Sequence, residues 1–241
     1  MLRILFAAFA SVMLAVPALA AQLNDQTLAA PGFYNGSGNP SNNFAVDTET
    51  LGSGTIELGL RARFRGGPNV TPVGDLYTFP TGTGSGGRAV WNYDFSVGLG
   101  SSGYRLSDFV GTGGSNLLTA SLTITDVNTA FTATINPVIY WSDSATHNGS
   151  TAFQNGSGYG SPGTMIGEQN SQNLQFADSP LAGDFNPWNG DTYLFNLKVS
   201  DSGGIIASVN MQVDAIPEPA SLTLLSLGLA GMTIVRRRKA S

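Results

Sequence analysis

The sequence predicts an all-β protein, an antiparallel β-sandwich of jelly-roll or immunoglobulin-like type, flanked by a signal peptide helix and a C-terminal transmembrane helix. Between residues 55 and 213, segments alternate apolar and polar side chains with a period of two, which is the pattern of strands with one buried face. Stretches rich in Gly, Asn, Ser and Thr separate these segments, and no helical period occurs among them. About eight or nine short strands joined by tight turns are typical of a sandwich.

Residues 1–20 have the pattern of a secretory signal peptide. Arg3 precedes an apolar stretch at residues 4–16, which ends in a proline and small residues. Ala18 and Ala20 place cleavage by signal peptidase before residue 21. The secreted domain is therefore assigned to residues 21–215, and a C-terminal tail to residues 216–241.

Strands are expected in order along the secreted domain. The strongest alternation predicts strands at residues 55–65, 90–97, 117–127, 131–135, 192–199 and 205–213, the middle pair and the last pair forming hairpins. Weaker patterns predict strands at residues 75–79, 104–110 and 174–177. The opening to residue 50 is expected to be a loop with at most a short strand at residues 44–46. Residues 142–191 are expected to be a long loop that hides elements or carries function.

The strand at residues 55–65 carries Arg61, Arg63 and Arg65 on its polar face, half of the basic residues of the secreted domain. Because alternate residues of a half-buried strand face water, we expect a solvated face that pairs with acids on a neighbouring strand. Contact with an anionic polysaccharide is the alternative.

Charge and cysteine content limit the function classes. Without the two terminal segments, six basic and fifteen acidic residues remain, a formal charge of −9. Such a surface repels phosphate, which argues against nucleic acid as a partner and favours divalent cations or neutral glycans. The chain has no Cys, which excludes disulfides, thiolate metal sites and a Cys nucleophile.

No motif identifies catalytic residues, and we expect a non-enzymatic protein. His147 is the single histidine, and no nucleophile-elbow motif supports a Ser-His-Asp set drawn with Asp143. The domain's three glutamates, Glu49, Glu57 and Glu168, stand in no catalytic motif. Because the paired carboxylates of a glycosidase meet in space and not in sequence, a secreted hydrolase of polysaccharide or protein stays the alternative.

Calcium is the one cofactor for which the loops offer ligands. Oxygen ligands of the kind that calcium prefers are found at Asp126, Asn128, Asp184, Asn186 and Asp191. No complete calcium-loop motif is present, so these residues are interpreted first as turn caps and second as a weak calcium site. No other metal or cofactor is expected.

Trp188 is the candidate glycan contact. It lies in a loop, whereas Trp91 and Trp141 lie in predicted strands and are expected in the core. An exposed indole offers a surface on which a sugar ring stacks. The alternative is a tryptophan that plugs one end of the sandwich.

Threonines at positions 119, 123, 125, 132 and 134 fall on one exposed face of a predicted hairpin. Flat arrays of threonine occur on ice-binding surfaces. Two strands of Thr and Ser are, however, the usual solvent face of a sandwich, where β-branched residues are favoured, and we adopt that interpretation.

The tail at residues 216–241 combines three elements. Pro217, Glu218 and Pro219 form a segment that the two prolines hold extended. An uncharged apolar run follows at residues 220–235, which as a helix spans about 24 Å against a hydrocarbon core of about 30 Å. Basic residues then stop translocation and keep the C-terminus in the cytoplasm, with the domain outside the inner membrane. These residues are Arg236, Arg237, Arg238 and Lys239.

Pro-Glu-Pro, a short apolar helix and a basic cluster in this order resemble the PEP-CTERM sorting signal of Gram-negative bacteria that make exopolysaccharide. The resemblance covers residues 216–241 only. It implies recognition by an exosortase, a polytopic membrane enzyme with a nucleophilic Cys that cuts near the motif and releases the protein or transfers it to the surface. The same tail also carries the label of an ice-binding protein C-terminal domain, which implies nothing about activity.

These observations together predict a surface-delivered or secreted protein of the extracellular matrix, structural or exopolysaccharide-binding. Its expected partners are signal peptidase and exosortase during processing, the inner membrane transiently, exopolysaccharide at its destination, and no nucleic acid. The alternative is a periplasmic protein that stays anchored in the inner membrane. An ordinary anchor accounts for the helix and the arginines but not for the paired prolines.

Overall fold

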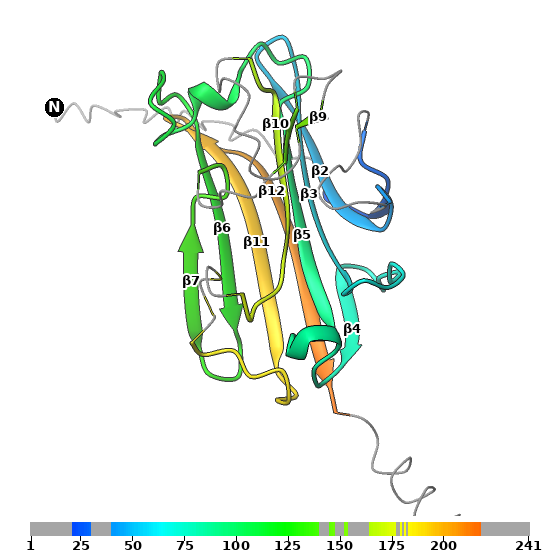
Figure 1. Ribbon diagram of the computed structural model, residues 1–241. Helices are drawn as coiled ribbons and strands as arrows, with labels where there is room; N and C mark the ends of the chain where they lie inside the picture. The colour runs from blue at the N-terminus through cyan, green and yellow to red at the C-terminus, as the bar shows by residue number, and fades with distance from the viewer. Residues whose placement is uncertain are drawn as a thin grey trace, which may run out of the picture.

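The computed structural model describes residues 21–29, 40–139, 145–147, 152–153, 164–176, 179, 181 and 183–217. In this part of the chain two β-sheets lie face to face, and no α-helix is present (Figure 1). The predicted signal peptide helix and transmembrane helix lie outside the described residues. The all-β prediction is therefore confirmed for the domain.

Sheet A holds seven strands and sheet B five. In sheet A the order is β1 (Leu23–Gln26), β2 (Phe44–Leu51), β3 (Gly54–Phe64), β5 (Trp91–Gly98), β10 (Gly167–Gln172), β8 (Ala145–His147) and β9 (Ala152–Phe153). In sheet B it is β4 (Leu76–Pro80), β12 (Gly204–Ile216), β11 (Thr192–Asp201), β6 (Thr119–Asp126) and β7 (Phe131–Ile135). Two short 3-10 turns complete the described elements, η1 (Ser85–Gly87) and η2 (Leu106–Asp108).

The apolar faces of the alternating strands meet between the two sheets. Buried side chains of β3 and β5 on one sheet, and of β6, β11 and β12 on the other, belong to one hydrophobic cluster. Phe79 stacks on Trp91 with ring centroids 5.7 Å apart, and Tyr93 lies 4.9 Å from Phe195. Burying each such ring contributes about 1.5–3 kcal/mol. The strong alternation thus predicted the core strands and both hairpins, β6–β7 and β11–β12.

Two of the weaker predicted strands are wrong. Residues 104–110 contain η2, because the Asp108 carboxylate accepts a hydrogen bond from the Arg105 N–H (2.8 Å) and closes a local turn. Leu174 lies in a turn, in which the Phe176 N–H donates to the Asn173 carbonyl (2.9 Å). The strand of this region is β10, upstream of that turn. Its sequence GEQNSQ is polar throughout and almost entirely buried, so it shows no alternation.

Other corrections concern the opening and the direction of one pair. The opening of the domain contains β1 and the full strand β2. Residues 142–191 hide elements, as expected, and these are β8, β9 and β10. The sandwich is not purely antiparallel, because β4 runs parallel to β12 with Leu76 beside Gln212. These two strands are far apart in sequence, so no hairpin turn constrains their relative direction.

Side chains form hydrogen bonds with the part of the β12 edge that β4 does not cover. β4 pairs with β12 only from Gln212 to Ile216. Upstream, the Ser208 N–H donates to Asp47 Oδ2 (2.7 Å). Gln22 bonds both backbone groups of Asn210, accepting from its N–H (2.6 Å) and donating to its carbonyl (2.8 Å). Two side chains thus occupy sites that a neighbouring strand would fill, which protects the edge from other chains.

Replacing Asp47 by Ala removes the acceptor of the Ser208 N–H. The free energy of unfolding is expected to fall by about 1–3 kcal/mol, measured by urea denaturation, because a polar group loses its partner. Asp47→Asn keeps an acceptor oxygen and is the matched control. Equal stability of the two variants would contradict the role given to this hydrogen bond.

The carboxyl of Asp47 also predicts a pH dependence. Burial raises its pKa above the ordinary value of 3.8, against the opposing effect of the Ser208 N–H. The folded protein therefore holds this proton more tightly than the unfolded chain, so the contribution to stability is complete below the unfolded pKa and is lost as the pH rises through the folded pKa. Asp47→Asn is expected to gain stability relative to the wild type over that rise, and a difference that is independent of pH would contradict this.

Candidate functional site

The outer face of sheet B, the side of the sheet turned away from the core, is an almost uncharged polar surface. Every second residue of β6, β11 and β12 is buried in the core, so the residues between point outward. Lys198 and Asp214 are the two charged residues in this set. The neutral polar ones are Thr119, Ser121, Thr123, Thr125, Thr192, Asn196, Ser200, Ser208, Asn210 and Gln212, and the exposed apolar ones include Leu194 and Ile216. Thr132 and Thr134 of β7 continue this face.

Hydrogen bonds between neighbouring strands hold this face in one arrangement. The hydroxyls of Thr123 and Thr134 are 2.9 Å apart, and those of Thr125 and Thr132 are 3.0 Å apart. The exposed threonine face predicted for the β6–β7 hairpin is thus confirmed for these four residues. Because each hydroxyl both donates and accepts, paired threonines still have bonding capacity for a ligand.

Amide side chains continue the array across β11 and β12. Asn196 donates through Nδ2 to the Ser208 hydroxyl (3.0 Å) and to Asn210 Oδ1 (2.7 Å). Gln212 on the next outward position donates to Asp214 Oδ1 (2.9 Å). The amide groups therefore have fixed orientations before any ligand arrives.

A groove of about 270 Å³ crosses this surface. Leu194 is 43% exposed and lines the groove, and the register places Thr125 on one side of Leu194 and Gln212 on the other. Asn196 and Asn210 line the groove at the next position along the strands. Asp75 is the one charged residue that lines the groove. The other lining residues are apolar or carry neutral donors and acceptors, which suits a ligand whose rings carry hydroxyl groups.

The arginines of β3 lie on the other sheet and are largely withdrawn from solvent. Arg61 donates through Nε to Asp94 Oδ2 (2.7 Å), and Arg63 donates to the same oxygen (3.0 Å). The side chains of Arg61 and Asp94 are both 0% exposed. Burial lowers the pKa of Arg61, and the Asp94 carboxylate opposes that shift.

The solvated face predicted for β3 is therefore wrong for Arg61 and Arg63, although pairing with an acid on a neighbouring strand is confirmed. The reason is that a preceding segment of chain covers Arg61. Its Nη1 donates to the carbonyls of Pro40 (2.6 Å) and Asn42 (2.9 Å), and its guanidinium carbon lies 4.3 Å from the centroid of the Phe44 ring.

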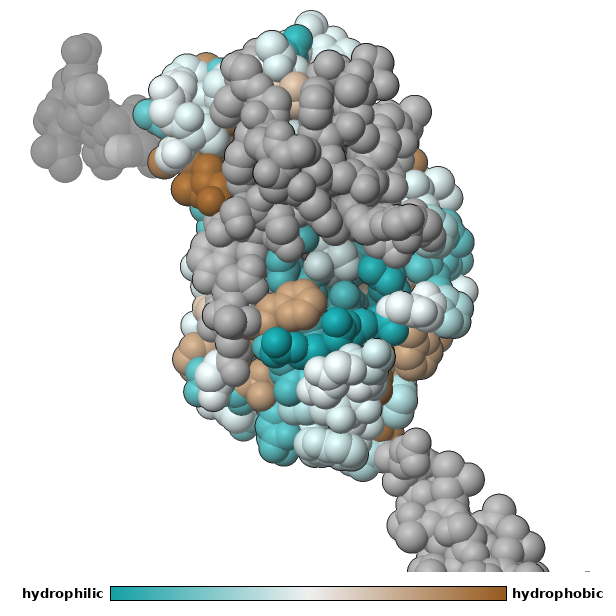
Figure 2. Space-filling model, in the orientation of Figure 1, coloured by the Kyte–Doolittle hydropathy of each residue, from teal (hydrophilic) through white to brown (hydrophobic). Residues whose placement is uncertain are grey.

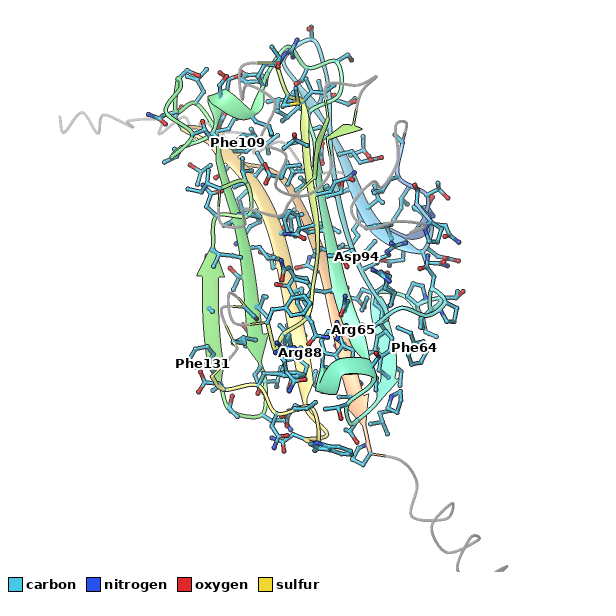
Figure 3. The ribbon with its side chains drawn as sticks, in the orientation of Figure 1. Phe64, Arg65, Arg88, Asp94, Phe109 and Phe131 are labelled. Carbon is cyan, nitrogen blue, oxygen red and sulfur yellow. The ribbon has the colours of Figure 1, made fainter. Side chains whose placement is uncertain are left out.

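Arg65 is the one of the three that keeps a half-exposed head group. It and Arg88 each lie 5.6 Å from the centroid of the Phe176 ring. Figure 3 shows both guanidinium side chains in the lower half of the sandwich, and Figure 2 shows hydrophilic residues gathered in that region. Neither forms an ion pair within the described residues. Of the three arginines, Arg65, which directly follows β3, alone keeps the exposure that the alternative role of binding an anionic polysaccharide requires.

The calcium candidates fall into two groups. Asp126 caps a turn, because its Oδ1 accepts from the Asn128 N–H (2.9 Å). Asn128 instead joins this turn to the start of β11, because its Oδ1 accepts from the Thr192 N–H (3.2 Å). Asp191 and Asp126 both lie near the Tyr193 hydroxyl, whose pKa is raised by burial first and by these two carboxylates second.

The second calcium group lies in the turn before β11. There Asp184 is exposed and Asn186 caps the Trp188 N–H (3.0 Å). Among the described residues, no three Asp, Glu or His side chains gather closely enough to hold a metal ion. Turn caps are therefore observed for two of the five candidates, Asp126 and Asn186, and calcium binding stays a prediction.

Trp188 is 66% exposed and lies at the end of the sandwich where β12 ends. One side of the indole rests on Gly82, where an added Cβ would lie 3.1 Å from the ring and where φ is +114°. The glycine is therefore required twice, for its conformation and for the contact. A groove of about 480 Å³ surrounds the ring, lined also by Pro80, Thr81, Thr83 and Val90.

The other two tryptophans were expected in the core. Trp91 is 2% exposed in the core, as predicted, and Trp141 lies outside the described residues.

Of the residues considered for catalysis, His147 and Glu168 lie on neighbouring strands of sheet A, because β8 pairs with β10 and His147 is beside Gly167. His147 lies in β8, and Asp143 lies outside the described residues. Glu168 is buried in β10, whereas Glu57 on β3 accepts hydrogen bonds from the Ala29 N–H (3.0 and 3.1 Å). Burial raises the pKa of Glu57, and that backbone bond opposes the shift.

The sorting motif begins where the described fold ends. The Thr81 N–H donates to the Ile216 carbonyl (3.0 Å), and Pro217 is the last described residue. Cleavage residues Ala18 and Ala20, Glu218, Pro219 and the basic cluster lie outside the described residues. The described part of the chain contains no helix long and apolar enough to span a membrane.

Comparison with known proteins identifies the tail. The model of the PEP-CTERM protein-sorting motif matches residues 215–239. No curated protein and no solved structure matches the chain. The chain thus carries a PEP-CTERM sorting signal, which marks it as an exported protein that exosortase processes at the membrane on its way to the surface.

The groove residues Leu194, Asn196, Asn210 and Gln212 were not predicted from the sequence, in which they are ordinary strand positions. The available signal was that outward positions on successive strands are polar but uncharged. Their meeting in one groove depends on the pairing of β11 with β6 and β12, which the sequence pattern does not supply.

Replacing Asp94 by Ala is expected to lower the free energy of unfolding by about 3–5 kcal/mol, because it leaves the buried Arg61 charge uncompensated. Urea denaturation of the secreted domain measures the change. Asp184→Ala removes a carboxylate from an exposed turn and is the control, with an expected change within about 0.5 kcal/mol. If both variants unfold at the same urea concentration, the buried ion pair is not needed for stability.

Proposed function

We propose that this exported domain is a non-enzymatic protein of the extracellular matrix that binds neutral exopolysaccharide through the outer face of sheet B. The observation that carries the proposal is the groove across β6, β11 and β12, with an exposed leucine between rows of neutral amides and hydroxyls. The sorting signal supports the destination, since its family resemblance is to proteins of bacteria that make exopolysaccharide.

The chemistry of the groove favours neutral sugars over other ligands. Sugar hydroxyls need donors and acceptors with fixed orientation, which the Asn196 network and the threonine pairs supply. The apolar face of a sugar ring needs a flat carbon surface, which Leu194 supplies. Each neutral hydrogen bond contributes only about 0.5–1.5 kcal/mol, so useful affinity requires several contacts along a chain, as a polysaccharide provides.

Sorting is tested by replacing Pro217, Glu218 and Pro219 with Ala. The wild-type protein is expected in the medium or on the cell surface as a species that begins at Ala21 and ends near Pro217. The variant is expected in the inner membrane with residues 236–241 retained, because exosortase no longer recognises the tail. The intact mass of the protein in each cell fraction measures this. A wild-type protein that keeps its tail in the inner membrane would show a permanent anchor.

Glycan binding is tested on the secreted domain by affinity electrophoresis in the exopolysaccharide of the producing strain. Asn196→Ala and Gln212→Ala are each expected to weaken binding about three- to ten-fold, because each removes hydrogen bonds from the groove. Thr119→Ala, on the same face but not among the groove residues, is the matched control with unchanged affinity.

A Trp188→Ala variant separates the two candidate glycan contacts. Loss of binding in this variant, with Asn196→Ala unaffected, would move the glycan site from sheet B to the indole. Absence of retardation of the wild-type domain would contradict glycan binding at either place.

A further inference from the structure

The secreted domain has no linker between its fold and the sorting tail. β12 pairs with β4 as far as Ile216, which lies beside Pro80, and the Thr81 N–H holds the Ile216 carbonyl. The next residue, Pro217, packs on Gly190, where an added Cβ would lie 2.8 Å from the proline Cδ. The chain is therefore fixed to the body of the sandwich up to the first residue of the Pro-Glu-Pro motif (Figure 1).

The exposed Trp188 lies directly beside this exit. The indole rests on Gly82. Gly82 directly follows Thr81, whose N–H donates to the Ile216 carbonyl. The Gly82 N–H also donates to the carbonyl of Pro187, the neighbour of Trp188. The groove around the ring is lined by Pro80, Thr81, Gly82, Thr83, Val90 and Trp188, none of which is charged. Exit and groove thus form one end surface of the sandwich.

The length of the chain beyond the fold sets the distance of this surface from the membrane. Two residues, Glu218 and Pro219, separate Pro217 from the start of the apolar run at Ala220. The three Cα–Cα steps from Pro217 to Ala220 span about 10 Å when fully extended. The headgroup layer on each side of the hydrocarbon core is about 5–8 Å thick. When the apolar run lies in the bilayer, the end of the sandwich must therefore lie at or within the headgroup layer.

We propose that the groove around Trp188 is a membrane-docking surface that rests among the lipid headgroups of the inner membrane while the tail is uncut. Tryptophan favours this layer because its ring is apolar and its N–H is polar. Uncharged lining residues match zwitterionic headgroups, whereas the formal −9 charge of the domain disfavours anionic lipid. Docking holds the domain in one orientation, with the sorting motif at the membrane surface where exosortase works. This inference does not rest on glycan binding at sheet B.

The test uses the chain from residue 21 to residue 241 in phosphatidylcholine vesicles, with lipids brominated high on their acyl chains or unbrominated. Bromine quenches nearby indoles, so the emission assigned to Trp188 is expected to fall roughly two-fold or more in the brominated vesicles. That emission is the difference between the wild type and Trp188→Phe. Phenylalanine keeps a ring on Gly82, and a thermal melt by circular dichroism checks that the variant folds.

Equal fractional quenching of the wild type and Trp188→Phe would overturn the proposal, because the indole would then lie clear of the lipid. A change in Trp188 emission with added exopolysaccharide but not with brominated lipid would also overturn it and assign the groove to a glycan. Failure of Asn196→Ala to weaken glycan binding would contradict the proposed function and leave the quenching result untouched.

Discussion

The pairing of β12 with β11 is the interaction on which the rest of the structure depends. Ten residue pairs, from Thr192 beside Asp214 to Asp201 beside Gly204, join the two strands. This register sets Asn196 next to Asn210 on the outer face, and it turns the apolar residues of both strands into the core. On its other edge β12 pairs with β4, and the chain leaves the fold directly after β12, at Pro217. The proposed glycan groove, the core and the exit of the chain therefore all depend on the pairing of β12 with β11.

The two outer faces of the sandwich differ in electrostatics, and this difference separates structural from binding roles. On sheet A, charge is concentrated and withdrawn: Arg61, Arg63 and Asp94 form a buried network. Breaking such a network costs more than forming it gains, so its role is to fix how the strands and the covering segment meet. On sheet B, charge is nearly absent and the polar groups face outward. Ligand binding needs accessible groups, which favours sheet B.

The absence of a linker between β12 and the sorting motif couples export to the position of the domain at the membrane. A linker would let the domain tumble away from the bilayer, whereas direct continuation of β12 into the motif keeps the domain against it. The proposed docking gives the exposed Trp188 at the exit a role while the tail is attached, because tryptophan favours the headgroup layer.

Periodicity and tail composition let the sequence alone determine the strands around residues 55–65, 90–97, 117–135 and 192–213 and the sorting signal, because these depend on local pattern. Only the tertiary structure decided what depends on distant segments. β10 has no alternation because both of its faces are covered, and Arg61 is buried because the chain around Pro40 crosses it. Leu194, Asn196 and Gln212 lie together in the groove because of the register between β11 and β12, which the sequence of neither strand specifies by itself. The position of the Trp188 ring also depends on a distant segment, because the ring rests on Gly82, which lies more than a hundred residues away in the chain.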